Sequence, residues 1–85
     1  MSVKLLYFAS LRERLGSSGE TLDLPPGIST VAGLREYLMT RGGVWQAALE
    51  AGKALRVAVN QELAHSATAV KSGDEIAFFP PVTGG

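Results

Sequence analysis

The sequence predicts a single α+β domain, in which a mixed β-sheet packs against one main helix and shorter helices accompany it. Three observations lead to this prediction. Short apolar segments typical of strands lie near both ends of the chain, an amphipathic helical pattern occupies its middle, and glycine or proline separates the segments. With 85 residues, the chain has room for one hydrophobic core and not for two.

The first third of the chain predicts a strand, a short helix and a second strand. Residues 3–9 (VKLLYFA) are apolar on both faces, which indicates a strand near the middle of the sheet. Residues 10–16 place two leucines four positions apart and end in glycine, as a short helix does. Residues 20–27 alternate polar residues with leucine before a Pro-Pro-Gly sequence, which predicts a strand that ends in a turn.

A capped amphipathic helix is predicted in the middle of the chain. Ser29 or Thr30 offers a side-chain oxygen to its N-terminus, and the Arg-Gly-Gly of residues 41–43 ends it. Its apolar face repeats at helical spacing and consists of Val31, Leu34 and Leu38. Residues 44–52 predict a second, smaller helix. Its apolar side consists of Val44, Ala47, Ala48 and Ala51.

The C-terminal third predicts two more strands. Residues 54–60 alternate between large apolar and other side chains, as a half-buried strand does. Residues 72–75 predict a turn, and residues 75–80 predict a last strand that stops where Pro80 lacks an N–H group for the ladder. The predicted order is strand, short helix, strand, helix, helix, strand, strand.

Composition argues against several classes of protein. The formal net charge is zero and the basic residues are scattered among acidic ones, so no basic stripe is available to bind nucleic acid. The chain has no cysteine, which excludes a disulfide, a thiolate zinc site and a cysteine nucleophile. Neither a cleavable signal peptide nor the roughly 20 apolar residues of a membrane helix can be found. We therefore expect a soluble cytoplasmic protein with no nucleic-acid or membrane partner.

The usual catalytic side chains are nearly missing from the sequence. His65 is the only histidine, and no spaced set of acids or cysteines joins it, so we expect a plain loop or surface histidine and no metal site. Asp74 and Glu75 are adjacent and would point to opposite faces of a strand. We interpret them as a solvated turn that begins a strand and not as a catalytic carboxylate pair.

The C-terminal residues carry the strongest functional signal. Pro80 and Pro81 favour a stiff, extended path, so residues 80–85 are predicted to project from a domain of residues 1–79 and to span roughly 20 Å. Gly84 and Gly85 have no side chains, which lets the backbone pass through a narrow channel. A partner enzyme with a nucleotide site could then convert the Gly85 carboxylate into an acyl-adenylate. The α-carboxyl group is therefore the predicted reacting group.

Three segments resemble a known family. They are GDEIAFFPPVTGG (73–85), YFASLRE (7–13) and VAVNQEL (57–63). With them, essentially the whole chain resembles the small, sulfur-carrying subunits of molybdopterin synthase, the MoaD family, which are ubiquitin-like proteins. The resemblance implies a ubiquitin-like β-grasp roll with a projecting C-terminal tail.

The resemblance also implies a reaction cycle for Gly85. An adenylating enzyme related to ubiquitin-activating enzymes would use ATP and magnesium to form the acyl-adenylate, and a sulfur donor protein would convert it to a thiocarboxylate. The tail would then enter the active site of the large subunit, where the sulfur attacks cyclic pyranopterin monophosphate to build the molybdopterin dithiolene. The tail residues involved would be Pro80, Pro81, Val82, Thr83 and Gly84.

The same resemblance assigns the catalysis to partners. The carrier is expected to bind no cofactor itself, and the acid and base groups are expected on the large subunit. Whether the chain counts as an enzyme is therefore left open, because it would be a non-catalytic, sulfur-donating subunit. Two carriers on a dimer of large subunits would form a heterotetramer.

An apolar docking patch is predicted on the sheet face opposite the main helix. Strand alternation implies that one of Phe78 and Phe79 is buried and the other available. The candidates for the patch are Leu6, Phe8, Leu63, Phe78 and Phe79. The resemblance favours Phe79, Leu63, Phe8 and Arg12 as the residues that contact the partners.

Other functions remain open at this stage. The same tail would suit a sulfur carrier for thiamine or cysteine synthesis, or a ubiquitin-like modifier that conjugates to lysines. A passive ubiquitin-like interaction module, whose C-terminus has no role, is a different class again. Deleting Gly85 would separate these classes, because only a carrier or modifier would lose its activity.

Overall fold

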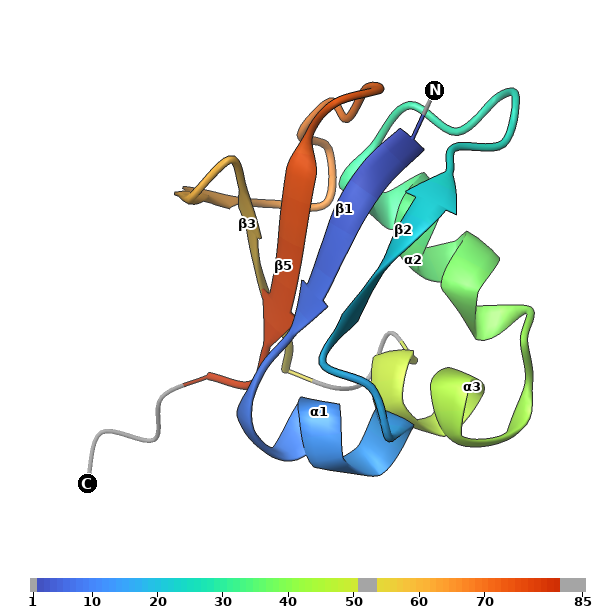
Figure 1. Ribbon diagram of the computed structural model, residues 1–85, viewed down its shortest axis with the longest axis vertical. Helices are drawn as coiled ribbons and strands as arrows, with labels where there is room; N and C mark the ends of the chain where they lie inside the picture. Colours follow the sequence, from blue (N-terminus) through green and yellow to red (C-terminus); the bar gives the residue numbers. More distant parts are fainter. Residues whose placement is uncertain (1, 51–53, 82–85) are drawn as a thin grey trace.

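The computed structural model describes residues 2–50 and 54–81 and contains a five-stranded mixed sheet in the order β2-β1-β5-β3-β4, with α2 across one face (Figure 1). The central pair, β1 and β5, is parallel, and the other neighbouring strands are antiparallel. The elements are β1 (Ser2–Tyr7), α1 (Ala9–Leu15), β2 (Gly19–Asp23), α2 (Val31–Met39), α3 (Gly43–Leu49), β3 (Arg56–Val59), β4 (Glu62–Ala64) and β5 (Glu75–Phe79). This arrangement confirms the predicted α+β roll with one main helix.

Strand β1 lies inside the sheet, as predicted, and its side chains alternate in burial. Val3, Leu5 and Tyr7 face α2 and are almost completely buried. The residues between them point to the other face of the sheet, where Leu6 is half-buried. The strand ends earlier than the predicted residues 3–9, because Phe8 is the N-cap of α1.

Helix α2 supplies the centre of the core. The predicted face is confirmed, since Val31, Leu34 and Leu38 are all buried. The Thr30 hydroxyl accepts a hydrogen bond from the Gly33 N–H at 3.1 Å, which identifies Thr30 as the cap. These three residues belong to a cluster of buried side chains that forms the core. The cluster consists of Val3, Leu5, Tyr7, Leu11, Leu15, Val31, Leu34, Leu38, Ala48, Leu49, Val57, Val70, Ile76 and Phe78.

Helix α3 is shorter than predicted and buries a different side. It spans Gly43–Leu49, not residues 44–52, and Ala48 and Leu49 are its buried residues. Val44 is 41% exposed and Ala47 is also exposed, so the predicted apolar side is wrong apart from Ala48. Ala51 lies outside the described residues. The physical reason is the size of Trp45, whose ring packs against the core and sets the rotation of this two-turn helix.

A polar and aromatic cluster attaches α3 to the sheet. The Tyr7 hydroxyl donates to Glu20 Oε2 at 2.9 Å, and the Arg41 guanidinium donates to both Glu20 carboxylate oxygens at 2.8 Å. The Arg41 guanidinium lies 4.4 Å from the centre of the Trp45 ring, and Trp45 meets Tyr7 edge to face at 5.5 Å. These four side chains form the Tyr7 cluster, which joins β1, β2 and α3 with the segment that follows α2.

Titration in the Tyr7 cluster follows from its contacts. The hydrogen bond from Arg41 holds the pKa of Glu20 below its ordinary value. Burial, assisted by the bond to Glu20, raises the pKa of Tyr7. At neutral pH the cluster therefore contains a carboxylate, a neutral phenol and a guanidinium, which is the combination that its hydrogen bonds require.

Strand β4 was not predicted, so the predicted order lacks one strand. Its three residues pair with β3 through a two-residue turn, Asn60-Gln61, in which both residues have positive φ, 52° and 70°. Such turns usually contain glycine at the second position. The strand was not predicted for two reasons. It is very short, and its turn has Gln61 at the position where glycine would have indicated a hairpin.

Asp74 is buried, which corrects the interpretation of residues 72–75 as a solvated turn. The residue is only 5% exposed, and its side chain accepts hydrogen bonds from Asn60 Nδ2 at 3.0 Å and from the Lys71 N–H at 2.9 Å. The bond from Asn60 is the main cause that lowers the pKa of Asp74. Asp74 therefore holds the β3–β4 turn against the start of β5.

The described part of the chain contains no helix that is long and apolar enough to cross a membrane. Strand β5 ends at Phe79. The division into a domain of residues 1–79 and a tail of residues 80–85 stays a prediction, because residues 82–85 lie outside the described residues.

The Tyr7 cluster makes stability depend on the charge of Glu20. A group whose pKa is lowered by folding stabilises the fold above its ordinary pKa, and this contribution is lost as the pH falls. We expect Glu20→Gln to lower the free energy of unfolding by about 1–2 kcal/mol at pH 7. In urea unfolding, the difference from the unmodified protein should shrink toward pH 3. Glu62→Gln, in an exposed position, is the control, and an E20Q effect that is independent of pH would contradict this account.

The strained β3–β4 turn predicts a stabilising substitution. Gln61 has φ of 70°, a conformation that glycine adopts without steric cost. We expect Gln61→Gly to raise the free energy of unfolding by up to about 1 kcal/mol. Gln61→Ala is the matched control, because alanine keeps the Cβ atom. Equal unfolding midpoints in urea for the two variants would show that the backbone strain is absent.

Candidate functional site

A row of apolar residues crosses the sheet face that points away from α2. Strand pairing places Leu6 beside Ala77, Ala77 beside Ala58, and Ala58 beside Leu63. The residues on either side of them in β1, β3 and β5 point into the core, so this row faces outward. Leu63 is 75% exposed. Of the two small alanines in the middle, Ala58 is half-buried and Ala77 is only 8% exposed, so Leu63 is the residue of this row that projects most.

A second apolar row lies beside the first, at the end of the sheet where β5 stops. Phe79 pairs with Arg56 of β3. Phe8 continues from β1, and its N–H donates to the carbonyl of Phe78 at 3.2 Å. Phe8 is 45% exposed, whereas Phe78 is 1% exposed. Phe79 is half-buried. Within the Phe78–Phe79 pair, the structure therefore confirms the predicted alternation, which buries Phe78 and leaves Phe79 partly exposed on the outer face.

Together these residues form one surface, which we call the outer-face patch. It consists of Leu6, Phe8, Ala58, Leu63, Ala77 and Phe79. Pro80 and Pro81 follow directly from Phe79 and are partly exposed, so the predicted tail begins at the edge of this patch. Figure 1 shows that β5 ends beside α1, at the end of the sheet opposite the β3–β4 turn.

The predicted docking residues come from three different elements. Leu63 lies on β4, Phe79 ends β5, and Phe8 caps α1. Arg12 is exposed on α1, and its N–H donates to the carbonyl of Phe8 at 3.3 Å. The structure therefore brings Phe8, Phe79 and Arg12 to the same end of the molecule. Their contacts with partners stay predictions.

The reacting end of the chain cannot be placed from this structure. Gly85, Gly84, Thr83 and Val82 lie outside the described residues, and their roles stay predictions. Pro80 and Pro81 are the described part of the tail.

Sequence reasoning missed the conformation of Ala9. Its φ is 55°, a left-handed conformation that costs a non-glycine residue roughly 1–2 kcal/mol. The sharp turn at this residue lets α1 begin directly after Phe8 and lets Phe8 stay beside β5. No sequence signal marks this position, because glycine or asparagine would be the usual residue.

The described polar residues form no evident catalytic set. His65 is exposed, as predicted, and its Nδ1 accepts a hydrogen bond from the Ala67 N–H at 3.2 Å. The Asp74 carboxylate accepts hydrogen bonds from Asn60 in the β3–β4 turn and from Lys71, with which it also forms an ion pair. Within residues 2–50 and 54–81, no group of three or more His, Asp or Glu side chains is placed to hold a metal ion.

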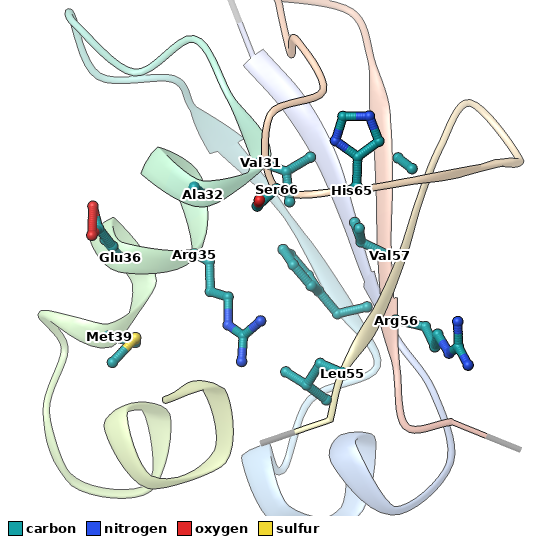
Figure 2. A pocket seen from close by; sticks show the side chains of 12 residues that line it. Val31, Ala32, Arg35, Glu36, Met39, Leu55, Arg56, Val57, His65 and Ser66 are labelled. Atoms are coloured by element: carbon teal, nitrogen blue, oxygen red, sulfur yellow. The ribbon is translucent and has the colours of Figure 1, made fainter. Parts of the chain in front are cut away.

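A cavity of about 490 Å³ lies on the other side of the sheet, between α2 and the β3–β4 hairpin (Figure 2). The core residues Val31, Val57 and Phe78 are among the residues that line it. Arg35 points into the space between α2 and Leu55, and burial lowers its pKa. Its guanidinium donates to the carbonyls of Leu49 and Glu50 at the C-terminus of α3 and so caps that helix. No sequence pattern indicated this cavity.

The fold and the exposed apolar sheet face beside the last strand define a ubiquitin-like β-grasp protein. Residues 5–85 match the model of the ThiS family, and the chain therefore belongs to this family.

Relatives with assigned names support the membership. The molybdopterin synthase sulfur carrier subunit of Haemophilus influenzae is 48% identical over 83 residues, which cover 98% of this chain and 99% of that protein. The crystal structure of small archaeal modifier protein 1 from Haloferax volcanii is 30% identical, with a TM-score of 0.73, and the match covers 95% of this chain and 98% of the other. Both proteins match nearly the whole chain.

A third relative supports the fold. It is a chain of the complex of subunits 1 and 2 of molybdopterin-converting factor from Helicobacter pylori. It is 23% identical, with a TM-score of 0.67, over all of both chains.

The two faces of the sheet predict opposite effects of similar substitutions. We expect Phe78→Ala to lower the free energy of unfolding by about 3–5 kcal/mol, because it empties part of the core. Leu63→Ala should change it by less than about 0.5 kcal/mol, because Leu63 is exposed. Urea unfolding followed by Trp45 fluorescence measures both. A large loss of stability in L63A would show that Leu63 is packed in the free protein.

Proposed function

We propose that this chain is the sulfur-carrier subunit of a molybdopterin synthase. The observation that carries the proposal is the 48% identity to a molybdopterin synthase sulfur carrier subunit over nearly the whole chain. The outer-face patch supports it, because the patch ends where Pro80 begins. A partner that covers the patch would thus hold the domain with the tail directed into its own active site.

The proposed chemistry takes place at the α-carboxyl group of Gly85. The carboxylate attacks the α-phosphate of ATP and releases pyrophosphate to form an acyl-adenylate. A sulfur donor protein then supplies sulfur at the oxidation level of sulfide, which displaces AMP and leaves a thiocarboxylate. Magnesium and ATP would be held by the adenylating enzyme.

The thiocarboxylate sulfur is the nucleophile in the next step. It forms a bond to a carbon of cyclic pyranopterin monophosphate in the large subunit, while the bond from that carbon to oxygen breaks and the oxygen leaves as water or with the phosphate. Water then cleaves the bond between sulfur and the Gly85 acyl carbon, which leaves sulfur on the pterin and restores the carboxylate. Two such deliveries build the dithiolene. Acid and base catalysis would come from the large subunit, while this chain contributes position and sulfur.

The outer-face patch is proposed to bind both the adenylating enzyme and the large subunit. The two complexes would then exclude each other, so the loaded carrier must leave one partner before it binds the next. Leu63 and Phe79 supply the apolar area, and Arg12 lies at the margin. We place this ATP-dependent cycle in the cytoplasm and expect two carriers on a dimer of large subunits.

A second candidate is a ubiquitin-like modifier. The similarity to small archaeal modifier protein 1 over 95% of this chain favours it. The activation step would be the same, but lysine amines of target proteins would attack the activated carbonyl carbon of Gly85. The two functions differ in their acceptor, and the products identify which acceptor is used.

Mass spectrometry of the intact protein from cells tests the proposal. We expect a species heavier by the difference between one sulfur and one oxygen atom, located at Gly85. Purified thiocarboxylated protein, incubated with the large subunit and cyclic pyranopterin monophosphate, should yield molybdopterin. A chain lacking Gly85 is the control and should fold normally but carry no sulfur.

Two outcomes would reject the carrier function. Failure to form molybdopterin from the thiocarboxylated protein would reject the assigned acceptor. Isopeptide conjugates to lysines, in cells that contain no thiocarboxylate, would favour the modifier.

A further inference from the structure

Two exposed arginines flank the start of the tail from opposite sides of the sheet. Arg56 is paired with Phe79 and borders the cavity, but it alternates with the buried Val57 along β3. Figure 2 shows its side chain directed to the side opposite Leu55. It therefore lies on the outer face, next to the outer-face patch. Arg14 lies on α1 and lines a small hollow together with Pro80 and the core residue Leu11. Arg14 is thus on the helix side of the same proline.

Both guanidinium groups are available to a partner. Among residues 2–50 and 54–81, the ion pairs are Arg41–Glu20 and Lys71–Asp74, and neither includes Arg14 or Arg56. The residues outside the described ranges contain no aspartate or glutamate, and their one acidic group is the C-terminal carboxylate of Gly85. The domain has no net charge, so these positive groups are balanced by acids elsewhere on the surface. Glu62 and Glu75, for example, lie at the far ends of their strands, beside the β3–β4 turn.

We propose that Arg14 and Arg56 bind carboxylates on the rim of the partner channel that receives the tail. This inference rests on the proposed function and adds the chemistry of the partner surface, an acidic rim with one carboxylate on each side of the opening. A guanidinium binds a carboxylate through two parallel hydrogen bonds, so a pair of such contacts would fix the rotation of the domain around the tail.

The anions bound by these arginines belong to the partner protein and not to the nucleotide. In the extended path predicted from the sequence, Gly85 would lie roughly 17 Å beyond Pro80, which is farther than an arginine at the start of the tail can reach. The phosphates that react at Gly85 are therefore out of range. Only groups at the entrance of the channel can meet Arg14 and Arg56 when the tail is inserted.

Exposed rim charges affect the rate of association more than the lifetime of a complex. Ion pairs at the edge of an interface are screened by salt, and they steer the partners toward each other before contact. The two arginines should therefore speed docking and make it sensitive to salt. The outer-face patch would provide most of the lasting affinity, because its apolar contacts do not depend on salt in this way.

The test measures binding of this chain to its adenylating enzyme by stopped-flow mixing at 50, 150 and 300 mM sodium chloride. We expect Arg14→Gln with Arg56→Gln to reduce the association rate constant and the affinity between about threefold and thirtyfold at the lowest salt concentration. The salt dependence should become weaker. Lys4→Gln is the matched control, since Lys4 is exposed on the same sheet face but near the opposite end.

Circular dichroism and urea unfolding should show that both variants fold like the unmodified protein, because the substituted side chains are exposed. If the double variant binds with unchanged affinity and salt dependence, the proposal of an acidic rim is overturned. The proposed function would then remain intact. An equally large loss of association rate and affinity in K4Q would also overturn the acidic rim, because the effect would then come from the total charge of the chain and not from the positions of Arg14 and Arg56. Complete absence of binding by the unmodified chain would overturn both proposals.

Discussion

The parallel pairing of β1 with β5 determines where every element of the candidate site lies. It places Leu6 beside Ala77 on the outer face and Tyr7 beside Phe78 in the core. Because the two strands run in the same direction, Phe8 and Phe79 leave the sheet at the same end. A shift of this pairing by one residue would turn each side chain of the shifted strand to the opposite face of the sheet. The patch residues of that strand would then be buried and its core residues exposed. The buried Phe78 and Ile76 therefore also fix the position of the outer-face patch.

Polar side chains support the two ends of this central pair. The Tyr7 cluster holds α3 at the end where the tail begins, and Asp74 holds the β3–β4 turn at the other end. Each group has hydrogen-bond partners, and no buried side-chain nitrogen or oxygen in the described residues is left without one. Such networks define one arrangement of the elements, because an unpaired polar group in the core is costly. The outer face needs no such support, since only small and apolar side chains occupy its centre.

Sequence patterns identified the parts of the fold that have a strong period. The face of α2 was predicted correctly because the large residues Val31, Leu34 and Leu38 recur at spacings of three and four. The face of α3 was not, because its small alanines give a weak pattern and the large Trp45 side chain overrides it. Strand β4 and the burial of Asp74 were missed for a related reason. Both depend on contacts between segments distant in sequence, which no local pattern records.

The candidate site was predicted in part. Alternation alone showed that Phe78 and Phe79 face opposite ways, but the choice of Phe79 as the outward-facing residue came from the family resemblance. The structure buries Phe78 and leaves Phe79 half-buried on the outer face. The row through Ala58 and Ala77 could not be predicted, because it requires the register of four strands. The place of Arg56 beside Phe79 depends on the same register.

A carrier of this design separates binding from chemistry. The domain offers an apolar sheet face and charged groups, which a partner can recognise without touching the reacting atom. Binding energy gained at the patch can then be used to hold the distant carboxyl group in place for reaction. The stiff Pro80–Pro81 pair matters because a flexible link would let the tip move freely even while the domain is bound. The docking face and the reacting tip thus function together only when the segment between them keeps its direction.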